Sequence, residues 1–146
     1  MSEFFILSAA EYIVDKRPNR QISKAMLEST LYFIQEEFIK ETGAPLFREN
    51  FVKSGTYPKC IIIEQFENGT VYESQLSEFR RKFSAGKREI MDRVADRLKD
   101  SNSMEILEMI EKDIPWNETK ENKVVSHKAM RDAFSHKGEK TGNDSP

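Results

Sequence analysis

The sequence predicts a mainly α-helical, compact domain with, at most, a small β-hairpin around residues 60–76. Apolar side chains recur three to four residues apart over most of the chain, which is the spacing of one helix face. Between these stretches stand Ser, Gly and Pro residues of the kinds that begin and end helices. The 146 residues, 38% of them hydrophobic, suffice to bury one core without a disulfide or a metal. We expect one helical domain over residues 1–135 and a disordered tail over 136–146, which has little to bury.

The first two helices are predicted over residues 3–16 and 23–42. Pro18 ends the first pattern, and Ser23 has the position and chemistry of an N-cap for the second. Gly43 follows the second helix, where glycine adopts the left-handed backbone of a helix end without strain. The expected buried face of this helix consists of Met26, Leu27, Leu31, Phe33, Ile34, Phe38 and Ile39.

Residues 43–86 contain more turn-forming residues. Residues 60–66, CIIIEQF, are β-branched and apolar enough for a short strand, and Asn68-Gly69 then suggests a turn into TVYESQL. A small hairpin is the plain interpretation. A short buried helix over 60–66 is the alternative, because seven residues are too few for periodicity to decide.

Three helical patterns follow. The first covers about residues 90–98, and the second covers 104–110 with Ser103 as its candidate N-cap. Pro115 closes that second unit. Ser126 caps a last helix that carries Ala129, Met130, Ala133 and Phe134.

The charge and the cysteine content indicate which class of partner and which compartment to expect. There are 23 basic and 25 acidic residues, with a net charge of −2. A dedicated nucleic-acid binder usually carries a basic excess, so nucleic acid is possible but not favoured as a partner. Cys60 has no second cysteine to pair with, which suits a reducing compartment. We see neither a signal peptide nor an apolar run long enough to span a bilayer, so we expect a cytoplasmic protein that does not bind membranes.

The sequence offers few groups for catalysis. Its histidines are His127 and His136, and the sole thiol, Cys60, lies in an apolar run where it behaves as a small hydrophobic residue. There is no phosphate-binding glycine loop. The carboxylates fit solvated helix faces, as the i,i+4 pair of Glu36 and Lys40 illustrates, although spacing alone leaves a carboxylate pair open. We therefore predict no catalytic residue, no metal ligand and no cofactor.

Two local features suggest contact with a partner. Residues 79–83, Phe-Arg-Arg-Lys-Phe, place Arg80 and Arg81 between aromatics and suit nucleic acid or an acidic protein surface. The favoured alternative is a helix end whose phenylalanines reach the core while the charges stay in water. Trp116, the only tryptophan, is either a lid on the core or an exposed anchor for a partner; the core lid is favoured.

Three motifs belong together. The helix at 23–42 opens as Ile-Ser-x-x-x-Leu-x-x-x-Leu-Tyr-Phe, and Thr-Gly-x-Pro-Leu-Phe follows it; Ile-Pro-Trp at 114–116 precedes the last helix. These motifs resemble the Panacea domain, the family that includes SocA-like antitoxins and GepA-like phage proteins. The matching residues in the first two motifs and just after them are Ile22, Ser23, Leu27, Leu31, Tyr32, Phe33, Thr42, Gly43, Pro45, Leu46, Phe47 and Phe51.

The chain departs from that family after the Pro-Leu-Phe element. The family usually continues with Ala-Trp and then Gly-Pro-Val, whereas residues 52–59 here read VKSGTYPK and keep only Pro58. Loops on a rigid scaffold commonly carry recognition. Tyr57 and Lys59 flank Pro58, which limits the cost of ordering them on binding. We predict that both contact a partner; the alternative is that Tyr57 covers an edge of the core.

The resemblance implies a mostly helical, non-catalytic protein that binds and neutralises a partner toxin, as antitoxins of bacteria and their prophages do. Its departure from the family implies that the partner differs from the usual ones. One alternative is a phage-encoded inhibitor of a host defence protein, and another is a nucleic-acid-binding regulator that uses the basic cluster. After Tyr57 and Lys59, the candidate partner-binding residues are Trp116, Arg80 and Arg81.

Overall fold

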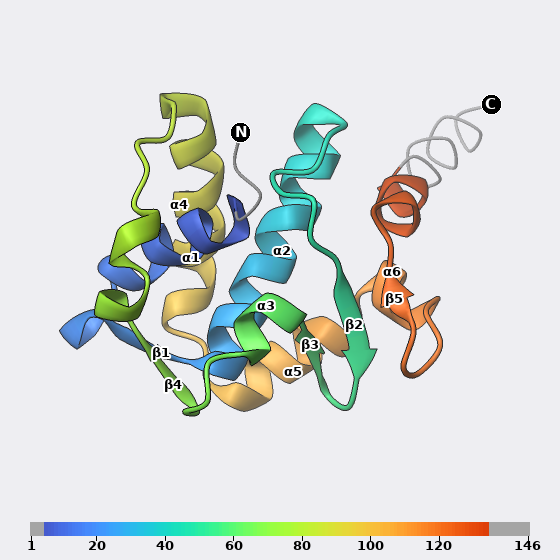
Figure 1. The fold of residues 1–146 in the computed structure, drawn as a ribbon. Coiled ribbons are helices and arrows are strands. Elements are labelled where there is room, and N and C mark those ends of the chain that lie inside the picture. Colours follow the sequence, from blue (N-terminus) through green and yellow to red (C-terminus); the bar gives the residue numbers. More distant parts are fainter. Residues whose placement is uncertain (1–4, 135–146) are drawn as a thin grey trace.

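The helix α2 (Lys24–Thr42) forms the centre of the fold in the computed structural model, which describes residues 5–134 (Figure 1). Ser23 accepts a hydrogen bond from the Met26 N–H at 3.2 Å, as an N-cap does. Gly43 has a φ of 80° and donates its N–H to the Ile39 carbonyl at 2.9 Å. The predicted helix at 23–42 is therefore confirmed at both ends. The predicted disordered tail, residues 136–146, lies outside the described residues.

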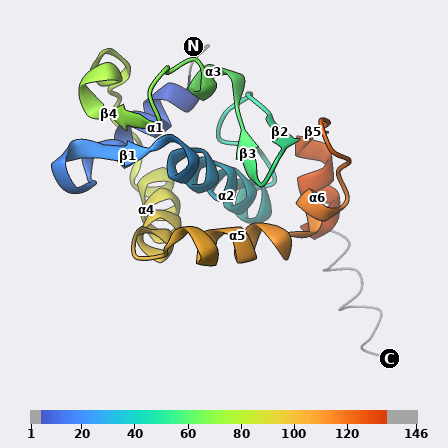
Figure 2. The ribbon, with the colours of Figure 1, turned by 90° about the horizontal axis from the view of Figure 1, so that it is seen from below.

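Two helices lie on one side of α2. They are α1 (Phe5–Asp15) and α4 (Ala85–Lys99), and both contact α2 (Figures 1 and 2). From the end of α4, α5 (Ser103–Glu111) runs toward the short helix α6 (Ile114–Asn117). Leu27, Leu31 and Ile34 on α2 are all fully buried, so the predicted apolar face of α2 forms the middle of the core.

The strands form two small antiparallel sheets. One pairs β1 (Gln21–Ser23) with β4 (Thr70–Tyr72), with Ile22 opposite Val71. In the other, β2 (Phe51–Ser54) lies between β3 (Tyr57–Lys59) and β5 (Val124–Val125). Gly55, with a φ of 83°, occupies the two-residue connection between β2 and β3. Short 3-10 helices complete the connections: η1 (Pro18–Arg20), η2 (Glu73–Gln75) and η3 (Ser77–Phe79).

The small hairpin predicted around residues 60–76 is wrong in its position. The hairpin of the fold is β2–β3, and residues 61–64 form the short helix α3 (Ile61–Glu64). Asn68 and Gly69 do not connect paired strands; instead the Gly69 carbonyl accepts the Lys24 N–H at 2.7 Å. Strand β4 finds its partner β1 far away in the sequence. Strands of three residues are too short for alternation to reveal such a pairing.

The later helices cover their predicted positions, but α4 begins at Ala85, about five residues before the predicted start. The N-cap of α5 is Asn102 and not the predicted Ser103, because Asn102 and Glu105 satisfy one another's backbone N–H groups in a capping box. Helix α6 is an addition to the prediction; the Asp113 side chain accepts the Trp116 N–H and caps it. Ser126 caps the last helix as predicted, accepting the Ala129 N–H at 2.9 Å. Among residues 5–134, no helix combines the length and apolar character needed to cross a bilayer.

Candidate functional site

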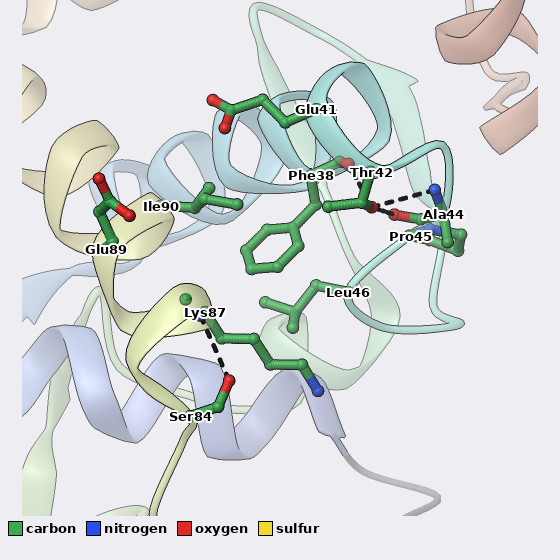
Figure 3. Close-up of a pocket in the computed structure, with 11 residues that line it drawn as sticks. Phe38, Glu41, Thr42, Ala44, Pro45, Leu46, Ser84, Lys87, Glu89 and Ile90 are labelled. Atoms are coloured by element: carbon green, nitrogen blue, oxygen red, sulfur yellow. Dashed lines mark hydrogen bonds between the residues drawn. The ribbon is translucent and has the colours of Figure 1, made fainter.

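A cleft of about 590 Å³ lies between the C-terminal end of α2 and the N-terminal end of α4. Its apolar floor consists of the buried side chains of Phe38, Leu46 and Ile90, which point into the space between the two helices (Figure 3). The other lining residues are Glu41, Thr42, Ala44, Pro45, Ser84, Gly86, Lys87 and Glu89. The cleft is open to solvent, and each of the three floor side chains is at most 7% exposed. We call it the α2–α4 cleft.

One wall of the cleft is the turn that follows α2. The Thr42 hydroxyl donates to the Phe38 carbonyl at 2.7 Å and also bonds to Ala44, which closes the helix end. Gln35, which is fully buried, accepts the Leu46 and Phe47 N–H groups and donates to the Phe47 carbonyl at 2.7 Å. Because a side chain satisfies these buried backbone groups, the turn is held in one position against α2.

The opposite wall is the first turn of α4. Ser84 caps this helix by accepting the Lys87 N–H at 3.4 Å. Gly86 follows the cap and has no side chain, and a Cβ placed on it would meet no atom within 4 Å. The absence of a side chain at Gly86 therefore keeps this end of the cleft open.

The charges on the rim differ in whether they are compensated. Arg93 forms ion pairs with Glu41 and with Glu37, the latter at 3.1 Å. Its hydrogen bond to Glu41 is the main reason that the pKa of Glu41 falls to about 2. Glu41 thus carries a charge that Arg93 already balances. Lys87, on the other side of the cleft, has no ion-pair partner among residues 5–134.

A basic and aromatic surface adjoins the cleft at Lys87. The Lys87 Nζ lies 5.2 Å from the centroid of the Phe5 ring, and the Arg81 guanidinium carbon lies 4.8 Å from the same centroid. The Phe5 ring also contacts Phe83, at 5.4 Å between centroids. Lys82, between Arg81 and Phe83 in the chain, is exposed. We call Phe5, Arg81, Lys82 and Lys87 the basic-aromatic patch.

Arg80, although next to Arg81 in the sequence, is engaged in a different way. Its guanidinium donates to Glu11 at 3.2 Å and to Glu73 at 2.9 Å, while Arg20 bridges Glu73 and Asp15. Oxygen atoms of the three carboxylates lie within 4.8 Å of one another. Two arginines supply the cations between them, so the group is an ion-pair network that ties α1 to η2. Arg80 therefore contributes structure and not a free positive charge.

The pKa values of the two buried carboxylates of this network, Glu11 and Glu73, shift in opposite directions. Burial is the main reason that the pKa of Glu11 rises to about 7, and the bond to Glu73 raises it further. The same bond, together with Arg80, lowers the pKa of Glu73. Glu11 sits on the apolar face of α1, and a charged residue at such a position is the signal in the sequence that marks a buried ion pair.

Tyr57 and Lys59 lie on β3, in a different part of the fold from the α2–α4 cleft (Figure 1). Both are half-buried. The Tyr57 hydroxyl donates to the Ser103 carbonyl at 3.3 Å, and its ring packs against the core. Tyr57 therefore covers an edge of the core, as the alternative prediction stated. Of the two side chains, Lys59 is the less engaged with the rest of the fold.

Trp116 is 4% exposed and belongs to the core. Its ring contacts Tyr32 at 6.0 Å between centroids, and Lys53 donates to its carbonyl at 3.0 Å. The core-lid interpretation is the one that the structure shows, and the indole does not project toward a partner. Phe83 is likewise buried, as the favoured interpretation of the basic cluster required, although residues 80–84 form a connection before α4 and not a helix end.

The thiol and the described histidine occupy structural positions. Burial raises the pKa of Cys60 to about 11, which keeps it a neutral thiol. The His127 Nε2 lies 3.1 Å from the Gln35 amide nitrogen and 3.2 Å from the Glu49 carbonyl oxygen. His127 is therefore half-buried and bonded to neighbouring polar groups. His136 lies outside the described residues.

A buried polar group at the centre of the fold escaped prediction. Glu36, assigned from the sequence to a solvated face with Lys40, is only 6% exposed, and one of its carboxylate oxygens has no hydrogen-bond partner. Burial, and next the carboxylate of Asp113, holds the pKa of Glu36 well above its usual range. Asp113 in turn accepts the Tyr32 hydroxyl at 2.6 Å. Tyr32 and Glu36 are four residues apart on α2, so they share its buried face.

No family model matches this chain, and no curated protein or solved structure matches it either. The resemblance to the Panacea domain therefore stays a prediction from the motifs. In the structure, Thr42, Ala44, Pro45 and Leu46 of one of those motifs line the α2–α4 cleft. The motif and the cleft thus coincide in the fold.

Proposed function

We propose that this chain is a non-catalytic protein-binding module that takes a side chain or a short segment of a partner into the α2–α4 cleft, and that it neutralises a toxin in this way, as an antitoxin does. The observation that carries the proposal is the open, apolar cleft held between two rigid helix ends. An apolar hollow that is preformed and accessible lowers the ordering cost of binding and suits an aromatic or aliphatic anchor.

The polar groups of the cleft support binding over catalysis. The hydroxyls of Thr42 and Ser84 are engaged with the backbone of their own helix ends. The described thiol and imidazole belong to Cys60 and His127, neither of which lines the cleft. Nucleophilic catalysis needs a nucleophile within hydrogen-bond reach of a base, and the lining residues supply no such pair.

The antitoxin part of the proposal rests on the identity of the cleft wall. Thr42, Pro45 and Leu46 belong to the motif that resembles the Panacea domain, and all three line the cleft. An inhibitor of a host defence protein would use the same surface. The two roles differ in whether the partner arrests growth when it is expressed alone.

The test is affinity purification of the tagged full chain from its host, with the substitution Gly86→Trp to fill the cleft. Gly86 lies in the first turn of α4 and lines the cleft, and a Cβ at this position meets no atom within 4 Å, so the substitution begins in open space. We expect the parent protein to retain a partner in stoichiometric amount and Gly86→Trp to lose most of it. Gly86→Ala is the matched control and should retain the partner.

The recovered partner is then expressed alone and together with the chain. Growth arrest that the parent chain relieves, and that Gly86→Trp fails to relieve, supports the antitoxin role. A partner that is harmless when expressed alone contradicts that role and favours the inhibitor of a defence protein. Retention of the same partner by the parent and by folded Gly86→Trp would contradict binding in the cleft itself.

A further inference from the structure

We infer that the partner presents an acidic segment, with carboxylates next to an apolar side chain, and that the basic-aromatic patch binds the carboxylates while the α2–α4 cleft takes the apolar side chain. This inference deepens the proposed function and rests on it. It concerns the chemistry of the partner, which the cleft alone does not determine.

The first observation is the distribution of ion pairs. In the part of the chain that the structure describes, ion pairs engage Arg80, which precedes the patch, and Arg93, which lies further along α4. They leave Arg81, Lys82 and Lys87 without a carboxylate. Residues 79–88 contain no acidic residue at all. In a protein of net charge −2, this stretch is therefore a local excess of uncompensated positive charge.

The second observation is the convergence of two of these cations on one ring. Arg81 and Lys87 lie within 4.8 and 5.2 Å of the Phe5 centroid. A ring face holds a cation but leaves its outward hydrogen-bond donors unused. A guanidinium and an ammonium group held against one ring in this way are preordered for carboxylates, which gain charge-assisted hydrogen bonds without first ordering the side chains.

The third observation joins the patch to the cleft. Lys87 belongs to both, since its side chain lines the cleft while its Nζ lies over Phe5. A segment that places an apolar side chain between Phe38 and Ile90 would thus have its neighbouring residues beside Lys87. Acidic residues on the patch side of Lys87 complement the patch, whereas basic ones there would meet like charges.

The partner need not be known for a test. A random dodecapeptide library displayed on phage is selected against the immobilised full-length protein. We expect the enriched sequences to combine an aromatic or aliphatic residue with neighbouring Asp or Glu. A synthetic peptide of the most enriched sequence should bind the parent at least about tenfold more tightly than the double variant Arg81→Glu, Lys87→Glu. Added salt should weaken the binding.

The charge-reversed variant is expected to fold. Lys87 is the third residue of α4 after its cap Ser84, a position where Glu completes a capping box. Arg81 is exposed and has no ion pair among the described residues. Lys120→Glu, Lys123→Glu is the matched control, because it makes the same change of net charge at residues between α6 and β5, away from the patch. This control should bind the peptide as the parent does.

Several outcomes would overturn the inference. No enriched sequence, enriched sequences without acidic residues, or equal binding by the Arg81→Glu, Lys87→Glu variant would each do so. Apolar peptides that bind the parent but not Gly86→Trp would overturn the inference while leaving the cleft as a binding site. Peptides that bind the parent, Gly86→Trp and the charge-reversed variant with equal affinity would contradict both the acidic-partner inference and binding in the α2–α4 cleft. A short fluorescent single-stranded DNA that binds the patch more tightly than the peptide would reassign the patch to nucleic acid.

Discussion

The Tyr32 hydroxyl on α2 donates a hydrogen bond of 2.6 Å to the Asp113 carboxylate, which caps α6. Tyr32 is fully buried, so this bond ties the central helix to the far end of α5 across 81 residues of sequence. Glu36 lies on the same face of α2 and interacts with both partners. The core around α2 is thus held by a buried polar group as well as by apolar contacts.

Truncation of Leu31 to Ala should destabilise the fold strongly. Leu31 is fully buried at the middle of α2, and loss of its side chain leaves a cavity that costs about 2–5 kcal/mol in the free energy of unfolding. Chemical denaturation followed by circular dichroism measures this change. A Leu31→Ala variant that melts within about a degree of the parent would show that the core lies elsewhere.

The stability of the protein should fall as the pH rises from weakly acidic to weakly basic. Burial raises the pKa of Glu28 to about 8 and holds that of Glu36 well above its usual range. Above the unfolded pKa of about 4.5 and below the folded pKa, the folded state binds protons that the unfolded state has released. The free energy of unfolding therefore decreases through this window, by at most about 1.4 kcal/mol per pH unit for each group.

Glu36→Gln isolates one of these two contributions, because glutamine keeps the shape and stays neutral. We expect the variant to match the parent near about pH 5 and to be the more stable of the two near about pH 8. The difference between the two denaturation midpoints at each pH is the measurement. Parallel pH profiles for parent and variant would mean that Glu36 ionises normally in the folded protein.

The double variant Tyr57→Ala, Lys59→Glu tests the competing surface on the β2–β3 hairpin. If the partner occupies the α2–α4 cleft, its affinity should change less than about tenfold, or less than about 1.4 kcal/mol, in this variant. Calorimetric titration with the purified partner measures the affinity, and the melting temperature shows that the fold is kept. A larger loss in a folded variant would move the interface to the hairpin, as the sequence alone predicted.

Combined replacement of Cys60, His127 and His136 by Ala should leave neutralisation of the partner intact. The thiol is buried and His127 is bonded to neighbouring polar groups, so their roles in the fold are structural. Growth of cells that express the partner together with the triple variant is the readout. A folded triple variant that fails to protect those cells would reopen the possibility of catalysis.

Local signals in the sequence were sufficient for the helix framework. Ser23 and Gly43 act on their own turns of α2, and the apolar spacing between them is a property of that segment alone. The pairing of β1 with β4 depends instead on strands of three residues that meet only in the folded chain. For the same reason the sequence misplaced the hairpin.

The site was predictable only in part. The turn at 42–47 is visible as a motif, but the other wall of the cleft comes from α4, where Gly86 has no signal beyond an ordinary helix start. Glu36 was misassigned because Asp113, which shares its buried surroundings, lies far away in the sequence. Arg80 and Arg81 are neighbours with the same chemistry, and only the folded structure shows that carboxylates compensate one and not the other.

Amide hydrogen exchange of the full chain, with and without the co-purified partner, tests most directly whether the partner occupies the α2–α4 cleft. We predict that the partner slows exchange at residues 42–47 and 84–90, which form the two walls, and leaves the β2–β3 hairpin unchanged. Slowed exchange at residues 51–59, with both walls of the cleft unaffected, would contradict the proposed site.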